Sequence, residues 1–149
     1  MNKQLSFQLP EIDREKTKEA VEAALERYRV YLLTVPEDKL PKITQSFTLV
    51  PPSNTNAFKS TTEDAAVSTI QYEQEREKFL ERIRNAVNRL NYNERAVIIR
   101  RYLDNEERFD YEVYNELGMS ERKYYRVKSR AFYKLAFILR LEVYCDNSA

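Results

Sequence analysis

The chain of 149 residues contains no histidine, one cysteine and one glycine. The absence of histidine removes the commonest general base, every Ser–His or Cys–His nucleophile pair and any Cys/His zinc cluster. Cys145 has no second cysteine with which to form an intrachain disulfide. One glycine is too few for a Gly-rich phosphate-binding loop. We therefore expect a protein that is not an enzyme and that carries no cofactor and no metal.

Long hydrophobic runs are also missing. No apolar stretch approaches membrane-spanning length, and Met1 to Glu11 lacks the profile of a signal peptide. Hydrophobic residues nevertheless make up 42% of the chain, which is enough for a core. The length fits one domain, or one small domain with an appendage. These features predict a folded cytoplasmic protein that does not contact membranes.

The formal net charge is only +1, so the chain as a whole does not attract nucleic acid. The charges are segregated instead. Residues 91–119 hold four arginines against seven acids, which are Glu94, Asp104, Glu106, Glu107, Asp110, Glu112 and Glu116. Residues 120–140 hold one acid, Glu121, against seven basic residues. A local basic face of this kind can bind phosphates even when the total charge is near zero.

Residues 1–61 are predicted to form an N-terminal helix followed by a Pro-rich loop segment. Asp13 is a candidate N-cap for a helix that runs to about Leu33. The apolar residues of this helix recur at helical spacing and are Val21, Ala24, Leu25, Tyr28 and Leu32. Prolines punctuate residues 36–61, where alternating apolar residues from Ile43 to Leu49 predict one short strand.

Residues 62–90 are predicted to form one long helix. Ser60 and Glu63 have the spacing of a capping box, in which each side chain accepts from a free backbone N–H of the other residue. The two ends of the helix are apolar, whereas residues 73–78 are charged on all sides. Such a helix bridges two packed regions or pairs with a copy of itself. The absence of a sustained heptad favours the bridge.

Residues 91–149 have the element order of a helix-turn-helix domain. Asn91 and Glu94 again have capping-box spacing, and they open a short helix. Its apolar stripe consists of Ala96, Ile99, Tyr102 and Leu103. A second short helix starts at Asp110, with Tyr111, Val113, Tyr114 and Leu117 as its apolar residues. Gly118 provides the positive-φ stop, and Ser120 caps a longer helix.

The last helix, from Ser120 to about Leu139, is apolar on one side and strongly basic on the others. Its apolar stripe consists of Tyr124, Val127, Ala131, Leu135 and Ile138. The basic residues on the remaining faces are Arg122, Lys123, Arg126, Lys128, Arg130 and Lys134. The pattern favours a helix that contacts DNA. The alternative is an ordinary helix–helix turn in a bundle, for which the spacing alone would be equally suitable.

Several of these residues resemble known families. A resemblance to region 4 of sigma-70-type factors is seen at Leu90-Asn-x-x-Glu94, at Tyr102, in the Val113-x3-Leu117-Gly-Met-Ser120 turn and at Val127, Ala131 and Leu135. A closer resemblance, to the ArpU-type regulators of Gram-positive bacteriophages and prophages, is seen at residues 120–131 and at Leu135-Ala-x-x-Leu139. Similarity extends to Leu9-Pro-x-Ile-Asp13, to Tyr28-Arg29 and to the loop Ser53-Asn-Thr-Asn56, and so covers most of the chain. Tyr114 departs from the sigma pattern, which has a small residue where the two helices cross.

The resemblance implies a DNA-binding transcriptional regulator of phage or prophage late genes, including packaging and lysis genes, in the cytoplasm of a bacterial host. It also completes the predicted fold. We expect an all-α protein in which N-terminal helices and a loop-rich segment are joined by a long helix to a C-terminal, sigma region 4-like helix-turn-helix. The partner that the resemblance implies is double-stranded DNA, and RNA polymerase and a second copy of the chain are candidate further partners.

The predicted DNA-binding residues lie in the first turns of the last helix, which we expect to enter the major groove. They are Ser120, Glu121, Arg122, Lys123, Tyr125, Arg126, Lys128 and Arg130. The resemblance to sigma region 4 places base-reading positions at Arg122, Tyr125 and Arg126. A glutamate such as Glu121 can accept a hydrogen bond from a cytosine amino group. The remaining lysines and arginine are expected to hold phosphates, with help from Arg95, Arg100 or Arg101 of the preceding helix.

Two other classes of function also fit the pattern. A small-terminase-like subunit that recognises DNA for packaging would use a helix-turn-helix and a helical oligomer. A sigma-like or anti-sigma protein would dock its basic helix on an acidic surface of the polymerase machinery. In each of these cases we expect one of the two residues Tyr124 and Tyr125 to pack in the core and the other to be exposed.

Overall fold

The computed structural model describes residues 11–36 and 63–146, and gives side-chain environments from residue 69 onward in the second range. These residues form five α-helices and one π-helical segment: α1 (Arg14–Leu33), α2 (Glu63–Asn88), α3 (Tyr92–Ile98), η2 (Ile99–Leu103), α4 (Asp110–Glu116) and α5 (Glu121–Ile138). Apart from a single β-bridge between Ile12 and Tyr144, the described ranges contain no β-structure. The all-α prediction is confirmed. The predicted strand at 43–49 and the Ser60 cap lie outside the described residues.

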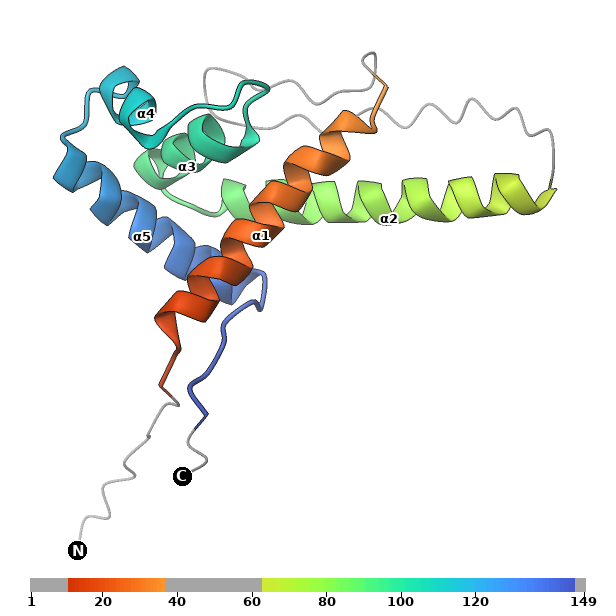
Figure 1. The fold of residues 1–149 in the computed structure, drawn as a ribbon, viewed down its shortest axis with the longest axis horizontal. Coiled ribbons are helices and arrows are strands. Elements are labelled where there is room, and N and C mark those ends of the chain that lie inside the picture. Colours follow the sequence, from red (N-terminus) through yellow and green to blue (C-terminus); the bar gives the residue numbers. More distant parts are fainter. Residues whose placement is uncertain (1–10, 37–62, 147–149) are drawn as a thin grey trace, which may run out of the picture.

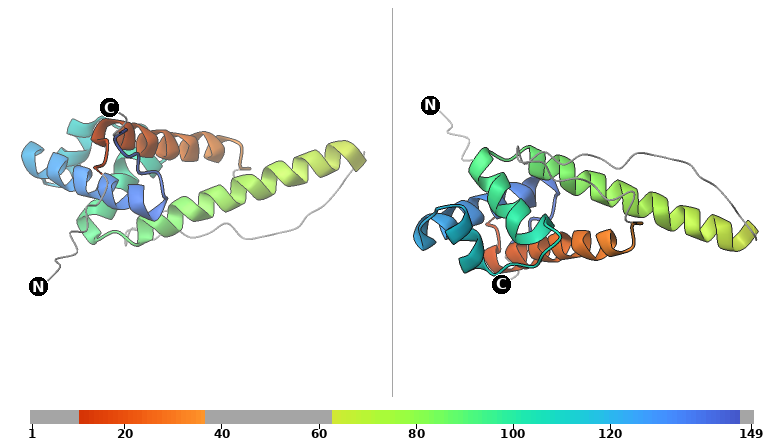
Figure 2. Two further views of the ribbon diagram at one scale, coloured as in Figure 1. Left: turned by 90° about the horizontal axis from the view of Figure 1, so that it is seen from below. Right: turned by 90° about the horizontal axis from the view of Figure 1, so that it is seen from above.

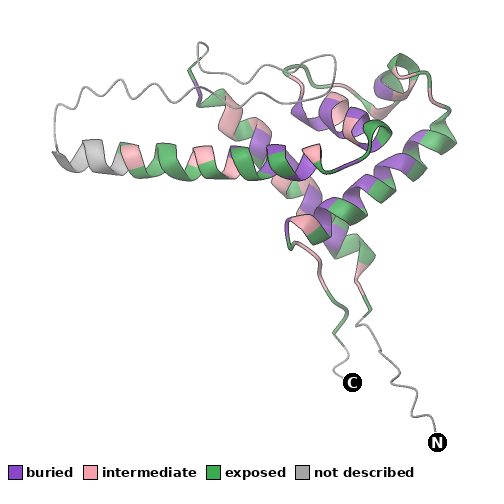
Figure 3. Cartoon of the chain, turned by 180° about the vertical axis from the view of Figure 1, so that it is seen from behind, coloured by how far each residue is buried: buried purple, intermediate pink, exposed green. Residues whose placement is uncertain are grey.

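The helices form a body from which the first half of α2 projects (Figure 1). α3, α4 and α5 lie together at one end, and α1 crosses α2 and packs against α2, η2 and α5. Both views of Figure 2 show α2 extending past α1 and away from α4 and α5. Burial follows this arrangement, because the buried positions of α2 begin at Leu80 (Figure 3). The second half of α2 therefore belongs to the body, and residues 69–75 before it are largely exposed.

One hydrophobic core joins the N-terminal helix to the C-terminal helices. The predicted α1 stripe packs into this core, where Val21, Leu25 and Tyr28 are at most 1% exposed. Full burial of each such side chain contributes about 1.5–3 kcal/mol. The other walls come from α2, α3, η2 and α5, with Ile83, Ile99 and Leu135 among the most deeply buried residues. Within the described residues, α1 and the C-terminal helices thus share this core.

α3 and η2 form one continuous helical segment before α4, and hydrogen bonds fix both of its ends. At its start, Asn91 accepts from the Glu94 N–H at 2.9 Å, and Glu94 accepts from the Asn91 N–H at 3.2 Å. This is the capping box predicted from the sequence. At its end the helix widens into η2, where the Asp104 N–H donates to the carbonyl of Ile99 at 2.8 Å. The π-helical widening was not predicted.

Arg29 of α1 fixes the end of η2. Its guanidinium donates to the carbonyls of Tyr102 at 3.2 Å and of Arg101 and Asp104 at 3.3 Å. The last carbonyls of a helix lack partners within the helix, so a cation at this position satisfies them and also opposes the helix dipole. The N-terminal helix thereby sets the position of the loop that enters α4.

The two ends of the described chain are joined by hydrogen bonds. The Asp13 N–H donates to the carbonyl of Val143 at 2.8 Å, and the Cys145 N–H donates to the carbonyl of Glu11 at 2.7 Å. The Thr17 hydroxyl accepts from the Val143 N–H at 3.0 Å. Asp13 also caps α1 as predicted, since its carboxylate accepts from the Lys16 N–H at 3.1 Å. The segment after α5 thus ties the start of α1 to the body.

Candidate nucleic-acid interface

A tight turn joins α4 to α5. Gly118 has φ +66°, a conformation that residues with a Cβ adopt only with strain. A Cβ added to Gly118 would meet no atom within 4 Å, so backbone conformation rather than crowding requires glycine there. The Met119 N–H donates to the carbonyl of Tyr114 at 2.9 Å and closes the turn. Ser120 caps α5, its hydroxyl accepting from the Lys123 N–H at 3.2 Å. Both predicted turn signals are confirmed.

A small apolar cluster separate from the main core fixes α4 against α5. It consists of Val97, Val113, Tyr124 and Val127, with Tyr114, Leu117 and Met119 packed around it. Tyr124 is fully buried, whereas Tyr125 is 44% exposed, so the expected division between the two tyrosines is confirmed. The cluster holds the first turns of α5 in a fixed orientation on the body.

Two aromatic residues of α4 depart from a simple apolar stripe. Tyr114 is half-buried, and its ring lies beside that of Tyr124 with centroids 5.6 Å apart. Tyr111 was predicted to belong to the apolar side of this helix, but it is 54% exposed. Its ring stacks on that of Phe109, with centroids 5.8 Å apart. A helix of two turns has room for few inward positions, and Val113 occupies the buried one.

Asp110 connects α4, η2 and α5 through one carboxylate oxygen. Its Oδ1 accepts from the Tyr124 hydroxyl at 2.6 Å, the Lys128 Nζ at 3.0 Å and the Arg101 Nε at 3.1 Å. Burial raises the pKa of Asp110, but the hydrogen bonds from Tyr124 and Lys128 and the nearby cations outweigh burial and hold the pKa below its ordinary value. Burial also raises the pKa of Tyr124, and the bond to Asp110 raises it further. This network orients α5.

Lys128 is placed differently from the other predicted DNA-binding residues. Its side chain is only 11% exposed, and it forms an ion pair with Asp110. This lysine therefore points into the protein and its charge is already paired, and its expected phosphate contact stays a prediction. A signal in the sequence was available: Lys128 follows Tyr124 by four residues, a spacing that puts both on the same side of a helix.

The other predicted residues are exposed on α5 and its cap. They are Ser120, Glu121, Arg122, Lys123, Tyr125, Arg126 and Arg130. At 3.6 residues per turn, Arg122 and Arg126 occupy the centre of the face opposite Tyr124 and Ala131. Lys123 and Arg130 flank one edge of this face, and Tyr125 flanks the other. None of these four cations forms an ion pair with another part of the chain that the structure describes.

The arginines before the turn are engaged within the protein. Arg101 pairs with Asp110 at 3.1 Å, and Arg100 pairs with Asp104 at 3.4 Å and with Glu116 at 3.7 Å. Arg95 donates to the carbonyl of Asn88. Each of these three arginines thus has a partner within the protein, and the expectation that one of them supplements the α5 contacts stays a prediction.

Many of the acidic side chains in residues 91–119 also form ion pairs. Arg108 pairs with Asp104 at 2.6 Å, Glu106 at 3.6 Å and Glu116 at 3.7 Å. The exposed charge left beside the turn is therefore dominated by the unpaired cations of α5. We define the α5 basic face as Arg122, Lys123, Arg126 and Arg130, and take it as the candidate interface.

The described residues lack the features of two further kinds of site. No group of three or more histidine, cysteine, aspartate or glutamate side chains there is arranged to hold a metal ion. None of the described helices combines the length and the apolar character needed to cross a membrane.

The chain is similar in sequence to two phage-related proteins. It is 34% identical over 137 residues to the uncharacterized phage-related protein Lin1259/Lin1739 of Listeria innocua, covering 92% of this chain and 96% of that protein. It is 26% identical over 140 residues to Protein Gp66 of Listeria phage A118, again covering 92% of this chain and 96% of the relative. No protein-family model and no solved structure matches the chain.

Proposed function

The chain belongs to the family of phage-related proteins represented by the Listeria innocua relative, and on this premise we propose that it is a sequence-specific DNA-binding transcriptional regulator. We propose phage or prophage late genes, including those for packaging and lysis, as its targets. The resemblance of residues 120–139 to ArpU-type regulators supports this choice of genes. In this proposal α4, the Gly118 turn and α5 act as a helix-turn-helix with α5 as the recognition helix.

The observation that carries the proposal is the unpaired α5 basic face. DNA affinity depends on cations that can neutralise phosphates without first breaking an internal ion pair. Arg122, Lys123, Arg126 and Arg130 meet this requirement, since they are exposed and unpaired in the described structure. The Asp110 network and the small apolar cluster beneath α5 hold that face in one orientation, as base reading requires.

The positions on the face suggest separate roles. Arg122 and Arg126 lie at its centre, so we assign them to base edges, where an arginine can bind guanine through two hydrogen bonds. Tyr125 and Glu121 lie beside them at the start of the helix and would contact neighbouring bases. Lys123 and Arg130 lie at one edge, so we assign them to phosphates that set the register.

We further propose that the protein acts as a homodimer, with RNA polymerase as the alternative partner. A single helix-turn-helix binds modestly, and a second linked contact multiplies its affinity. The part of α2 around residues 69–75 is suited to such a contact because it is largely exposed and lies on the half of the helix that projects away from α4. Light scattering that finds a monomer with tight DNA binding would contradict the dimer.

A binding selection followed by substitution tests the proposed DNA function. Duplexes selected from a random library provide the target, and gel shift measures the affinity of the unaltered protein and of Arg122→Ala and Arg126→Ala. We expect each substitution to cost about 1–3 kcal/mol and to relax the base preference at one position of the site. Lys18→Ala is the control, because it removes an equal charge from an exposed position on α1. Selection of no sequence, or equal losses in all three variants, would refute the assignment.

A further inference from the structure

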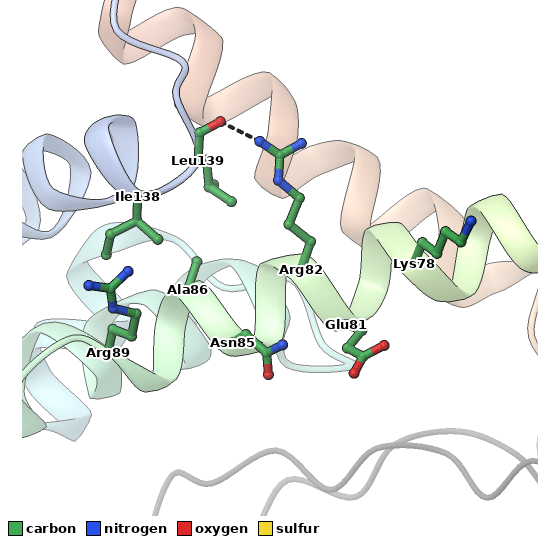
Figure 4. Close-up of a pocket in the computed structure, with 8 residues that line it drawn as sticks. All are labelled: Lys78, Glu81, Arg82, Asn85, Ala86, Arg89, Ile138 and Leu139. Carbon is green, nitrogen blue, oxygen red and sulfur yellow. Dashed lines mark hydrogen bonds between the residues drawn. The ribbon is translucent and has the colours of Figure 1, made fainter.

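A shallow pocket lies where the second half of α2 meets the end of α5, away from the α5 basic face (Figure 4). Its cations are Lys78 and Arg82 of α2 and Arg89 of the turn that directly follows α2. Ile138 is about 18 Å along α5 from Arg126, at 1.5 Å of rise per residue. The pocket is therefore a separate feature, and a ligand bound there would not depend on the proposed DNA function.

The three cations form a row along the α2 side of the pocket. Lys78 and Arg82 are one turn apart on α2, at a rise of about 6 Å. Arg89 follows directly after α2 ends and extends toward Ile138 (Figure 4). Lys78 and Arg89 are exposed, and neither forms an ion pair with any residue that the structure describes. Arg82 donates to the carbonyl of Leu139 at 2.5 Å, which fixes its guanidinium at the end of α5. Two positive charges of the row are thus free for a ligand.

The acid in the pocket does not neutralise this row. In Figure 4, Arg82 and Arg89 extend toward Leu139 and Ile138, whereas Glu81 and Asn85 point to the opposite side of α2. Glu81 also forms no ion pair among the described side chains. Glu81 and Asn85 thus line the pocket from the other side of α2, and the side of the pocket next to α5 is bordered by cations and apolar atoms.

The floor of the pocket is apolar. Ala86 and Leu139 are each 2% exposed and belong to the main core, and Ile138 is half-buried beside them. Apolar atoms beneath a cationic row match a ligand that carries negative charge and a hydrophobic side chain together. A DNA backbone offers the charge but gains nothing from the floor.

We propose that this pocket binds a short acidic peptide segment of a partner protein that presents an apolar side chain next to its carboxylates. The carboxylates pair with Lys78 and Arg89, and the apolar side chain rests on Ile138, which is the partly exposed residue of the floor. Charge-assisted hydrogen bonds at the rim set the orientation of the peptide. Burial of its side chain against the floor provides the selectivity for an acidic peptide that is also hydrophobic.

Fluorescence anisotropy with two labelled probes tests the proposal on the full chain. One probe is a short peptide of repeated Ser-Glu-Leu units, and the other replaces each leucine with serine. We expect the leucine probe to bind at least about fivefold more tightly than the serine probe. The double variant Lys78→Gln/Arg89→Gln is expected to weaken the leucine probe about tenfold. The matched control, Arg122→Gln/Arg126→Gln, removes the same charge from α5 and should leave peptide binding unchanged.

Each alternative result overturns the inference. If the leucine probe does not bind, or if both probes bind equally, the apolar floor does not recognise a peptide. If both double variants weaken the peptide equally, binding follows net charge alone. If a random-sequence DNA duplex displaces the peptide from the control variant, and Lys78→Gln/Arg89→Gln weakens that duplex by a similar factor, the row is a phosphate contact. Circular dichroism of each variant verifies that its helices are intact.

Discussion

The two charged regions on either side of the Gly118 turn hold similar residues but use them differently. Before the turn, Arg100, Arg101 and Arg108 form ion pairs with acids of the same region. After it, the four cations of the α5 basic face are unpaired within the described residues. The difference shows that a count of charges does not measure a binding surface. The cations before the turn build the unit, and those after it are available to a ligand.

Lys128 belongs to the first group although it lies in the second region. It is nearly buried and pairs with Asp110, as Arg101 does. Lys128 shows that α5 has one side that packs on the rest of the protein and another side that faces outward. The comparison therefore concerns the two sides of the turn and also the two sides of one helix.

Loss of Arg29 is expected to have the largest effect on stability among the paired cations. Arg29→Ala would leave the carbonyls of Arg101, Tyr102 and Asp104 without this donor. Hydrogen bonds to a charged group contribute about 1.5–3 kcal/mol each, and nearby water would recover part of the loss. We expect a decrease of about 2–4 kcal/mol in the free energy of unfolding, measured by urea denaturation. A decrease below about 0.5 kcal/mol would show that α1 does not fix the end of η2.

Tyr124→Phe tests the Asp110 network with a smaller expected effect. The substitution keeps the buried ring and removes the hydroxyl that donates to Asp110 at 2.6 Å. We expect a loss of about 1.5–2.5 kcal/mol in the free energy of unfolding. Tyr125→Phe is the matched control, because that side chain is 44% exposed and should change stability by less than about 0.5 kcal/mol. Equal effects of the two substitutions would show that the Asp110 network does not hold α5 in place.

The pH dependence of stability gives the smallest expected signal of the three. The pKa of Asp110 is lowered from 3.8 in the folded protein, so its contribution is present above that value and is lost as the pH falls through the folded pKa. The unaltered protein should therefore lose stability below about pH 4 more steeply than Asp110→Asn, which has no carboxylate to protonate there. Urea denaturation across this range measures both slopes. Parallel slopes would mean that Asp110 does not stabilise the fold through its charge.

Features set by neighbours in sequence were predictable. Asp13, Asn91 and Ser120 each cap a helix through a bond to a residue three positions ahead, and Gly118 terminates α4 by its own φ angle. The apolar stripes of α1 and α5 were also correctly predicted, because helical periodicity alone places them on one side. The all-α class followed from these signals.

Features set by distant partners were not predictable in this way. The carboxylate of Asp110 meets Tyr124 and Lys128 from 14 and 18 residues away, and Arg29 reaches carbonyls more than 70 residues along the chain. Lys128 was predicted to lie with the DNA-binding cations of the last helix, because the charge of a residue does not show which side chain will pair with it. The resemblance to ArpU-type regulators and to sigma region 4 remains a prediction, as does the role of each residue of the α5 basic face in DNA binding.

The salt dependence of DNA affinity in a matched pair of arginine variants tests the central claim most directly. Arg130→Ala removes an unpaired cation of the α5 basic face, and Arg108→Ala removes a cation that pairs with Asp104, Glu106 and Glu116. Both variants and the unaltered protein are titrated against the same selected duplex over a series of salt concentrations. We predict that the slope of log affinity against log salt falls in magnitude by about 0.9 for Arg130→Ala and stays unchanged for Arg108→Ala. The reverse result, or an equal change in both variants, would contradict the distinction between free and paired cations.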